Sequence, residues 1–275
     1  MTTALRPLST GELLDRTFSL YRSHFGLFLG IFALPHLIVL GFQCLGAATR
    51  SPGTQLANAL IAMVWAFGAL ALQVVVGSAS QAATVVAVSE VHLDRPAGVA
   101  DSFLKVKGQI PGVIGLSLLV GLVAGVASLA FIVPGIYLFV MWSLAVPAKI
   151  LENKGITDAM SRSSDLTQGN RWRIFIIWLL FFVLSLGVGF LLRWPVEALA
   201  GVSSMMALQR STFIWQVGLL VSTFISECLV GPLLTIAMSL VYYDERVRKE
   251  AFDLQLMMMT MDAPVPAQSP VQAGA

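Results

Sequence analysis

The sequence predicts an all-α, polytopic membrane protein, and three observations carry this prediction. Hydrophobic residues make up 57% of the 275-residue chain and charged residues only 12%, whereas about a quarter of an ordinary soluble domain is charged. The apolar residues gather in six windows of the length that membrane-spanning helices need. The basic residues are concentrated in alternate connections between these windows. We therefore predict one membrane domain over residues 1–259, with no room for a soluble catalytic domain.

The six expected spans cover residues 25–48, 58–80, 110–132, 134–150, 174–192 and 213–243. No charge occurs between Lys107 and Lys149, and this interval is too long for one span. We divide it at Pro134 and Gly135, because these residue types are typical of turns. The apolar pattern of the second span continues beyond residue 80, so that helix is expected to project beyond the bilayer.

Short amphipathic helices are expected beside the spans, at residues 9–24, 96–107, 155–168 and 244–258. The first has a capping box formed by Ser9 and Glu12, and all four are expected to lie in the membrane interface. Three of them each precede a pair of spans, which favours three repeated units of interfacial helix plus hairpin. Residues 260–275 are rich in Pro and Ala and nearly uncharged, so we predict a disordered tail.

The distribution of basic residues predicts the orientation. Of the 17 lysines and arginines, 14 lie in the N-terminal segment, the second-to-third and fourth-to-fifth connections and the C-terminal segment. The other connections hold only Arg50, Arg193 and Arg210. By the positive-inside rule, both termini are expected in the cytoplasm.

Four segments together resemble one known family: "RPLSTGELLDRTFSLYRSHF", "PGIYLFVMWSLAVPAKILE", "AMSRSSDLTQGNRWRI" and "VYYDERVRKEAFDLQLM". They resemble the glycerophosphoryl diester phosphodiesterase membrane-domain family, a family of largely uncharacterised membrane proteins of bacteria and archaea. The most specific part is a C-terminal pattern that falls on Tyr242, Tyr243, Asp244, Arg246, Arg248, Lys249 and Glu250. This chain departs from it with Glu245 where an aliphatic residue is usual and Ala251 where Gly is frequent. The resemblance implies the cytoplasmic membrane of a prokaryote. It does not imply an enzyme, because the family name comes from chains in which such a domain is fused to a separate phosphodiesterase domain.

The sequence offers no pattern for catalysis, for a cofactor or for a metal. His24, His36 and His92 are far apart, without the spacing of a metal site. No nucleophile elbow, phosphate-binding loop or dinucleotide fingerprint occurs. The formal net charge of +2, without a basic run, argues against nucleic-acid binding. We therefore expect a protein that is not an enzyme.

Glu227 is the strongest candidate for a functional residue. Placing an ionisable group inside a span costs free energy, so such a residue marks a functional site by default. Gln73 and Gln81 belong to a small and polar stripe on the second span, and His36 lies at similar depth in the first. Pro35 and Pro232 are expected to interrupt their helices. Two interrupted helices with an acid between them are typical of a transporter. The alternative is that Glu227 is protonated, or paired with Gln73 or His36, and that the prolines are packing kinks.

The charged C-terminal segment is interpreted as an anchor that fixes the topology. Tyr242 and Tyr243 suit an aromatic belt, and Arg246, Arg248 and Lys249 suit the headgroup layer. Asp244 and Glu250 are expected to pair with arginines of this segment or of the "SRSSDLTQGNRWR" loop.

Three hypotheses for the function remain, and an intramembrane enzyme ranks last among them. The first is a non-enzymatic module embedded in the lipid bilayer, which serves a protein partner, a second copy of itself or a lipid through its cytoplasmic interfacial helices. The alternative is a small transporter that uses Glu227 and the polar face of the second span.

Overall fold

The computed structural model describes residues 8–49, 55–93, 95–205, 212–250 and 258, and within these ranges the chain is all-helical with no strand. This confirms the predicted fold class. The helices are α1 (Thr10–Ser23), α2 (Phe25–Ala48), α3 (Gln55–His92), α4 (Val99–Val106), α5 (Ile110–Ala130), α6 (Ile132–Met141), α7 (Ala145–Leu151), α8 (Ile156–Thr167), α9 (Arg171–Met205) and α10 (Thr212–Glu250).

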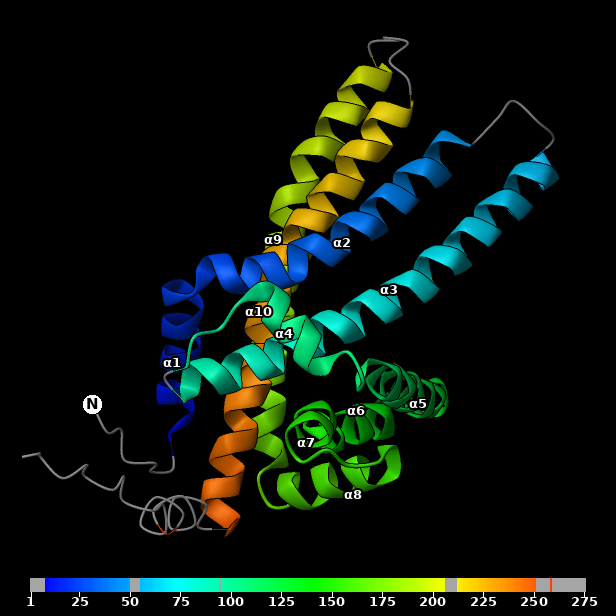
Figure 1. Cartoon of the computed structure of the whole chain (residues 1–275). Helices are drawn as coiled ribbons and strands as arrows, with labels where there is room; N and C mark the ends of the chain where they lie inside the picture. Colours follow the sequence, from blue (N-terminus) through cyan, green and yellow to red (C-terminus); the bar gives the residue numbers. More distant parts are fainter. Residues whose placement is uncertain (1–7, 50–54, 94, 206–211, 251–257, 259–275) are drawn as a thin grey trace, which may run out of the picture.

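Six helical segments of the described chain are long and apolar enough to cross a membrane, as predicted. The longest helices form two antiparallel pairs, α2 with α3 and α9 with α10, and α10 also packs against α2 (Figure 1). The end of α2 and the start of α3 lie toward the same end of the molecule as the end of α9 and the start of α10. The opposite end carries α1, α8 and the last turns of α10, and we call it the charged end.

Both expected interruptions of the spans are wrong, because α2 and α10 run continuously through Pro35 and Pro232. A proline leaves the carbonyl four residues earlier without its usual N–H donor. For Pro35 that carbonyl belongs to Ile31, and the Ser80 hydroxyl of α3 donates a hydrogen bond to it at 3.2 Å. A side chain from a neighbouring helix thus replaces the missing donor, as membrane helices require.

The turn between the third and fourth predicted spans lies earlier than expected. The helices separate at Phe131, whose φ of −153° and ψ of 132° are extended, and Pro134 and Gly135 belong to the first turns of α6. Proline is tolerated there because the first N–H groups of a helix have no partner within the helix. The fourth predicted span is also divided, since α6 ends at Met141 and α7 is a separate, buried helix.

The other boundaries differ mainly by extension. The helices α3 and α9 outrun the predicted spans, and α10 continues to Glu250, so the predicted separate helix 244–258 begins inside α10. Residues 251–257 and the predicted tail 260–275 lie outside the described residues. The capping box of Ser9 and Glu12 is confirmed at the start of α1. The three-unit repeat and the interfacial position of the short helices stay predictions.

Candidate functional site

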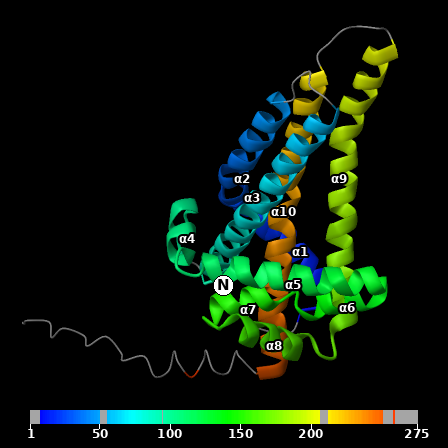
Figure 2. The same ribbon diagram turned by 90° about the vertical axis from the view of Figure 1, so that its right-hand side faces the viewer.

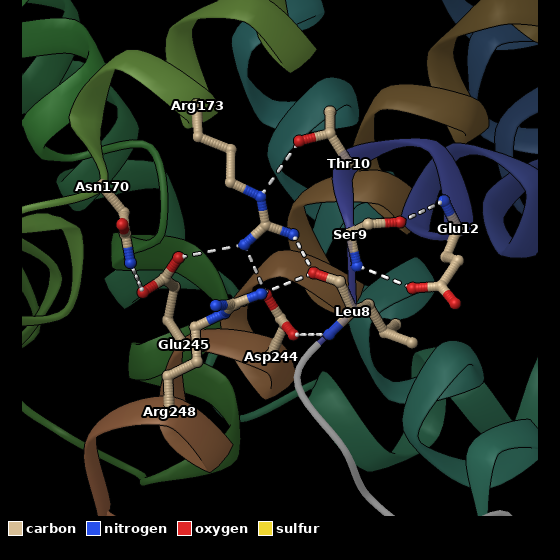
Figure 3. A network of polar contacts seen from close by, with 9 residues as sticks. All are labelled: Leu8, Ser9, Thr10, Glu12, Asn170, Arg173, Asp244, Glu245 and Arg248. Atoms are coloured by element: carbon tan, nitrogen blue, oxygen red, sulfur yellow. Dashed lines mark hydrogen bonds and ion pairs between the residues drawn. The ribbon is translucent and has the colours of Figure 1, made fainter.

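A cluster of buried charges lies where the end of α10 meets the start of α9 (Figure 3). Asp244 and Glu245 are 4% and 0% exposed. Arg173 of α9 donates a hydrogen bond from Nη1 to Asp244 Oδ2 at 2.5 Å, and the same nitrogen lies 3.5 Å from Glu245 Oε1. The second oxygen of Glu245 accepts a hydrogen bond from Asn170 at 2.7 Å. Buried carboxylates are stable only when paired in this way.

The segment before α1 completes this cluster. The backbone carbonyl of Leu8 accepts hydrogen bonds from Arg173 at 2.9 Å and from Arg248 at 2.5 Å, while the Leu8 N–H donates to Asp244 Oδ1 at 2.7 Å. Arg248 also donates to Asp244 Oδ2 at 2.9 Å. The beginning of the described chain, the start of α9 and the end of α10 are thus joined by charge-assisted hydrogen bonds, the stronger class of such bonds.

A second cluster surrounds Glu152, which follows α7. Its Oε1 atom accepts a hydrogen bond from the Tyr242 hydroxyl at 2.6 Å and one from Arg162 Nε at 2.9 Å. Lys154 lies 2.9 Å from the other oxygen, and Arg162 also pairs with Glu250 of α10. This cluster therefore joins α7, α8 and α10.

These contacts perturb the acid equilibrium of Glu152, which predicts a pH dependence of stability. Burial alone would raise the pKa of the Glu152 carboxyl, but hydrogen bonds from Tyr242, Lys154 and Arg162 outweigh it and lower the pKa to about 2. An unfolded glutamate has a pKa of about 4.3. Because the folded protein binds this proton less readily, it should lose about 3 kcal/mol of stability as the pH falls from about 4.5 to about 2.

The measurement is the melting temperature (Tm) of the purified protein in detergent across this pH range. Glu152→Gln should remove this part of the acid dependence, whereas Glu197→Gln, at a half-exposed carboxylate, should keep it. An unchanged acid profile in Glu152→Gln would contradict the assignment.

The remaining charges of the C-terminal segment also find partners within the chain. Lys249 donates to the carbonyls of Asp165 and Gln168 at 2.6 and 2.7 Å, which satisfies the C-terminal end of α8. Arg246 donates to Glu250 at 3.1 Å, one helical turn away. The predicted pairing of Asp244 and Glu250 with arginines of the "SRSSDLTQGNRWR" loop is confirmed, through Arg173 and Arg162.

The interpretation of this segment as a lipid-facing anchor is wrong for several of its residues. Tyr242 is fully buried, whereas an aromatic belt would expose it. Tyr243 stacks against His92 of α3, with ring centroids 5.2 Å apart. Asp244 and Arg248 bind each other and the backbone of Leu8. The segment therefore packs at the centre of the charged end, and contacts within the protein stabilise it.

Glu227 lies among the long helices, as predicted, and has both of the partners that the sequence suggested. Gln73 Nε2 donates to its Oε2 atom at 3.3 Å, and His36 Nε2 lies 3.9 Å from the same oxygen. The other ring nitrogen of His36 is 2.7 Å from the carbonyl of Phe32, which orients the imidazole. Gln81 is two turns further along α3, about 12 Å from Gln73 by the helical rise, and so lies outside this cluster.

A cavity of about 410 Å³ opens beside Glu227, between α9 and α10. Its polar lining includes Ser185, Arg193, Glu197 and Glu227, and Trp194 stands at its edge. Arg193 and Glu197 are half exposed and 3.8 Å apart, the expected helical pair. Their position beside Glu227 could not be predicted from the sequence, because they belong to a different helix.

Within the described residues, no group of three or more His, Cys, Asp or Glu side chains could hold a metal ion.

Comparison with protein families gives one match, the membrane domain of glycerophosphoryl diester phosphodiesterase, over residues 109–253. This is more than half of the 275 residues. The comparisons with curated proteins and with solved structures gave no match.

Proposed function

Because the chain belongs to the family of the membrane domain of glycerophosphoryl diester phosphodiesterase, we propose that it is a non-catalytic, membrane-embedded module that binds a zwitterionic phospholipid. The family description names the membrane portion of such proteins, and the chemistry needed for hydrolysis of a phosphodiester has no counterpart in the sequence patterns above. The single observation that carries the proposal is the polar cavity between α9 and α10. It supports binding of a polar headgroup at the membrane surface.

The length of α9 supports a position of this cavity at the level of the lipid headgroups. Twenty residues separate Arg173 at the charged end from Arg193, which at about 1.5 Å per residue gives about 30 Å. This equals the thickness of the hydrocarbon core. With Arg173 at one membrane surface, Arg193 reaches the headgroups of the other, and Glu227 lies deeper in the same cavity.

The charges suit a headgroup that carries both signs. The Arg193 guanidinium can bind a phosphate through two parallel hydrogen bonds. Glu197 and Glu227 offer carboxylates to an ammonium group, and the exposed face of Trp194 is suited to the interface and to cations. An anionic headgroup without an ammonium would add its negative charge beside both carboxylates and bring no cation to balance it.

The distribution of basic residues supports a cytoplasmic position for the charged end and for both termini. In that orientation the cavity opens to the outer leaflet. The family resemblance supports the cytoplasmic membrane of a bacterium or archaeon as the location. A protein partner or a second copy of the chain is the competing occupant of the module.

Purification in native lipid followed by mass spectrometry tests the proposal. We expect the wild-type protein to retain a zwitterionic phospholipid in near-stoichiometric amount. Arg193→Gln should reduce this retention about tenfold, because a charge-assisted hydrogen bond contributes about 1.5–3 kcal/mol. Lys107→Gln, an exposed charge at the other end, is the matched control and should retain the lipid. Equal retention by Arg193→Gln, or a stoichiometric protein in place of lipid, would refute lipid binding at this cavity.

Transport is the second candidate function, favoured by the hydrogen bond from Gln73 to Glu227 and the nearby imidazole of His36. These groups could pass a proton between a carboxylate and a histidine. Proton flux into reconstituted vesicles that disappears in Glu227→Gln would select this function. Lipid retention with no proton flux would leave the binding module as the function.

A further inference from the structure

The helices α5 and α6 form a hairpin that is oriented unlike the other apolar helices. In Figure 1 the helices α9 and α10 run steeply up the page and α2 and α3 run obliquely upward, while α5 and α6 are seen nearly end-on. The view turned by 90° shows the hairpin lying across the long helices, near the charged end (Figure 2). If the long helices cross the membrane, the axes of α5 and α6 therefore lie roughly parallel to the membrane plane.

The length of the second arm agrees with this orientation. The 10 residues of α6 extend about 15 Å by the helical rise, half of the hydrocarbon core of about 30 Å. The chain then turns at Trp142 into α7, whose residues from Ala145 to Ile150 are buried inside the protein. The candidate span Ile132–Leu151 reaches its 20 residues only by joining α6 and α7 across this turn. Neither helix of the second arm is long enough by itself to cross.

The surface of the hairpin is nevertheless suited only to an apolar environment. The chain between Lys107 and Lys149 carries no charged residue. Near the turn, Leu129 is 88% exposed and Val133 is 76% exposed, and exposed apolar side chains continue along both helices. A helix that is hydrophobic on all sides belongs in a protein core or in a membrane, and within the described residues no other helix covers this surface.

The base of the hairpin carries the charges expected at a membrane surface. Lys107 is exposed just before α5, where it can reach lipid phosphates. Lys105, one turn earlier, is half exposed and pairs with Glu90 of α3 at 3.1 Å. An apolar cavity of about 300 Å³ separates α6 from the first turns of α9, and Arg171 and Tyr137 are part of its lining. The Arg171 guanidinium lies over the Tyr137 ring, 4.7 Å from its centroid, and donates a hydrogen bond to the Tyr137 hydroxyl. The apolar cavity beside this pair is suited to an acyl chain.

We propose that the α5–α6 hairpin is embedded in the acyl chains of the leaflet at the charged end and does not cross the membrane. The long helices cross, and the hairpin enters and leaves on the same side, with its turn at Phe131 inside the bilayer. This arrangement rests on the orientation, length and exposed surface of the hairpin. It does not depend on the lipid cavity proposed beside Glu227.

Single cysteines test the position of the hairpin turn. The native Cys44 and Cys228 would be replaced by alanine, and one cysteine introduced by Leu129→Cys, by Leu104→Cys on α4, or by Leu199→Cys near the far end of α9. All three leucines are exposed, so the core is left intact, and an unchanged Tm confirms folding. Intact cells and inverted vesicles would be treated with a membrane-impermeant maleimide.

We expect labelling of Leu104→Cys from one side only and of Leu199→Cys from the other. Leu129→Cys should be labelled from neither side until detergent is added. Labelling of Leu129→Cys from the side of Leu199→Cys would mean that the hairpin crosses, and labelling from the side of Leu104→Cys would mean that it lies in water. Either result overturns the proposal.

A second measurement separates lipid from protein as the cover of the hairpin. A membrane-permeant fluorophore attached at Leu129→Cys should be quenched by phospholipids that carry a spin label on the acyl chain. Strong quenching supports a hairpin surrounded by lipid. Absence of quenching would mean that another protein surface, such as a second copy, covers the hairpin, and would overturn the proposal.

Discussion

Arg173→Ala is expected to destabilise the protein by about 3–5 kcal/mol, the usual effect of removing one partner of a buried ion pair. The guanidinium is the group that faces both Asp244 and Glu245, and neither carboxylate is accessible to water. Its loss also removes one of the hydrogen bonds to the Leu8 carbonyl. The measurement is the Tm in detergent, which should fall by on the order of 10 °C.

Two variants serve as controls. Lys105→Ala breaks the ion pair between the half-exposed Lys105 and Glu90 and should change stability by no more than about 1 kcal/mol. Arg173→Lys keeps the charge but cannot supply the forked geometry of the guanidinium, so its Tm should lie between those of wild type and Arg173→Ala. A wild-type Tm in Arg173→Ala would show that the cluster does not stabilise the fold.

Gly135→Ala is expected to force α6 away from α5 and to cost about 1–3 kcal/mol, the range for overpacking of a close contact. A methyl group at this position would overlap the Ser128 side chain and lie 2.8 Å from the Ser128 Cα atom. Because that atom is backbone, it cannot rotate out of the way, and the helices themselves must separate. A lower Tm, together with faster proteolysis at the hairpin, is the expected observation.

Gly121→Ala on α5 is the matched control, because nothing lies within 4 Å of a methyl group there. Alanine is the better helix former by up to about 1 kcal/mol, so this variant should be as stable as wild type or more so. Equal effects of the two substitutions would show that the approach of α6 to Ser128 is unimportant.

The fold class followed from composition and apolar windows, because spans of about 20 residues leave a signal that survives without tertiary information. The turn after α5 was misplaced for a physical reason. Proline has two frequent positions near a chain reversal, in the turn itself and in the first turn of the next helix. Pro134 occupies the second, and residue type alone does not separate them. The orientation of α5 and α6 across the long helices depends on packing between distant segments, which periodicity does not encode.

The charged residues show the same division between local and distant information. The C-terminal segment could be recognised in the sequence by its density of charged residues. The pairing of Asp244 and Glu250 with arginines of the "SRSSDLTQGNRWR" segment was predicted correctly. Glu152 was missed, because its partner Tyr242 lies 90 positions away. Glu245 was treated as a mere departure from the family pattern, although it is the most buried carboxylate of the segment. The pairing of Glu245 could have been predicted from the topology. Asn170 and Arg173 lie just before one predicted span, Asp244 and Glu245 lie just after another, and the positive-inside rule places both ends on the same side of the membrane.

The position of Leu8 in the charged cluster has a consequence for biosynthesis. The bond between its carbonyl and Arg248 joins residues 240 positions apart, so it cannot form until the last long helix has left the ribosome and entered the membrane. Until then the carboxylate partners of Arg173 do not exist, and the start of α9 carries an uncompensated cation at the membrane surface. Arrival of Asp244 and Glu245 neutralises it and secures the N-terminal segment in the same event. A nascent chain that stops short of residue 244 would therefore leave Arg173 without a carboxylate partner, and the N-terminal segment would be held to α9 only by the hydrogen bonds from Arg173 to Leu8 and Thr10.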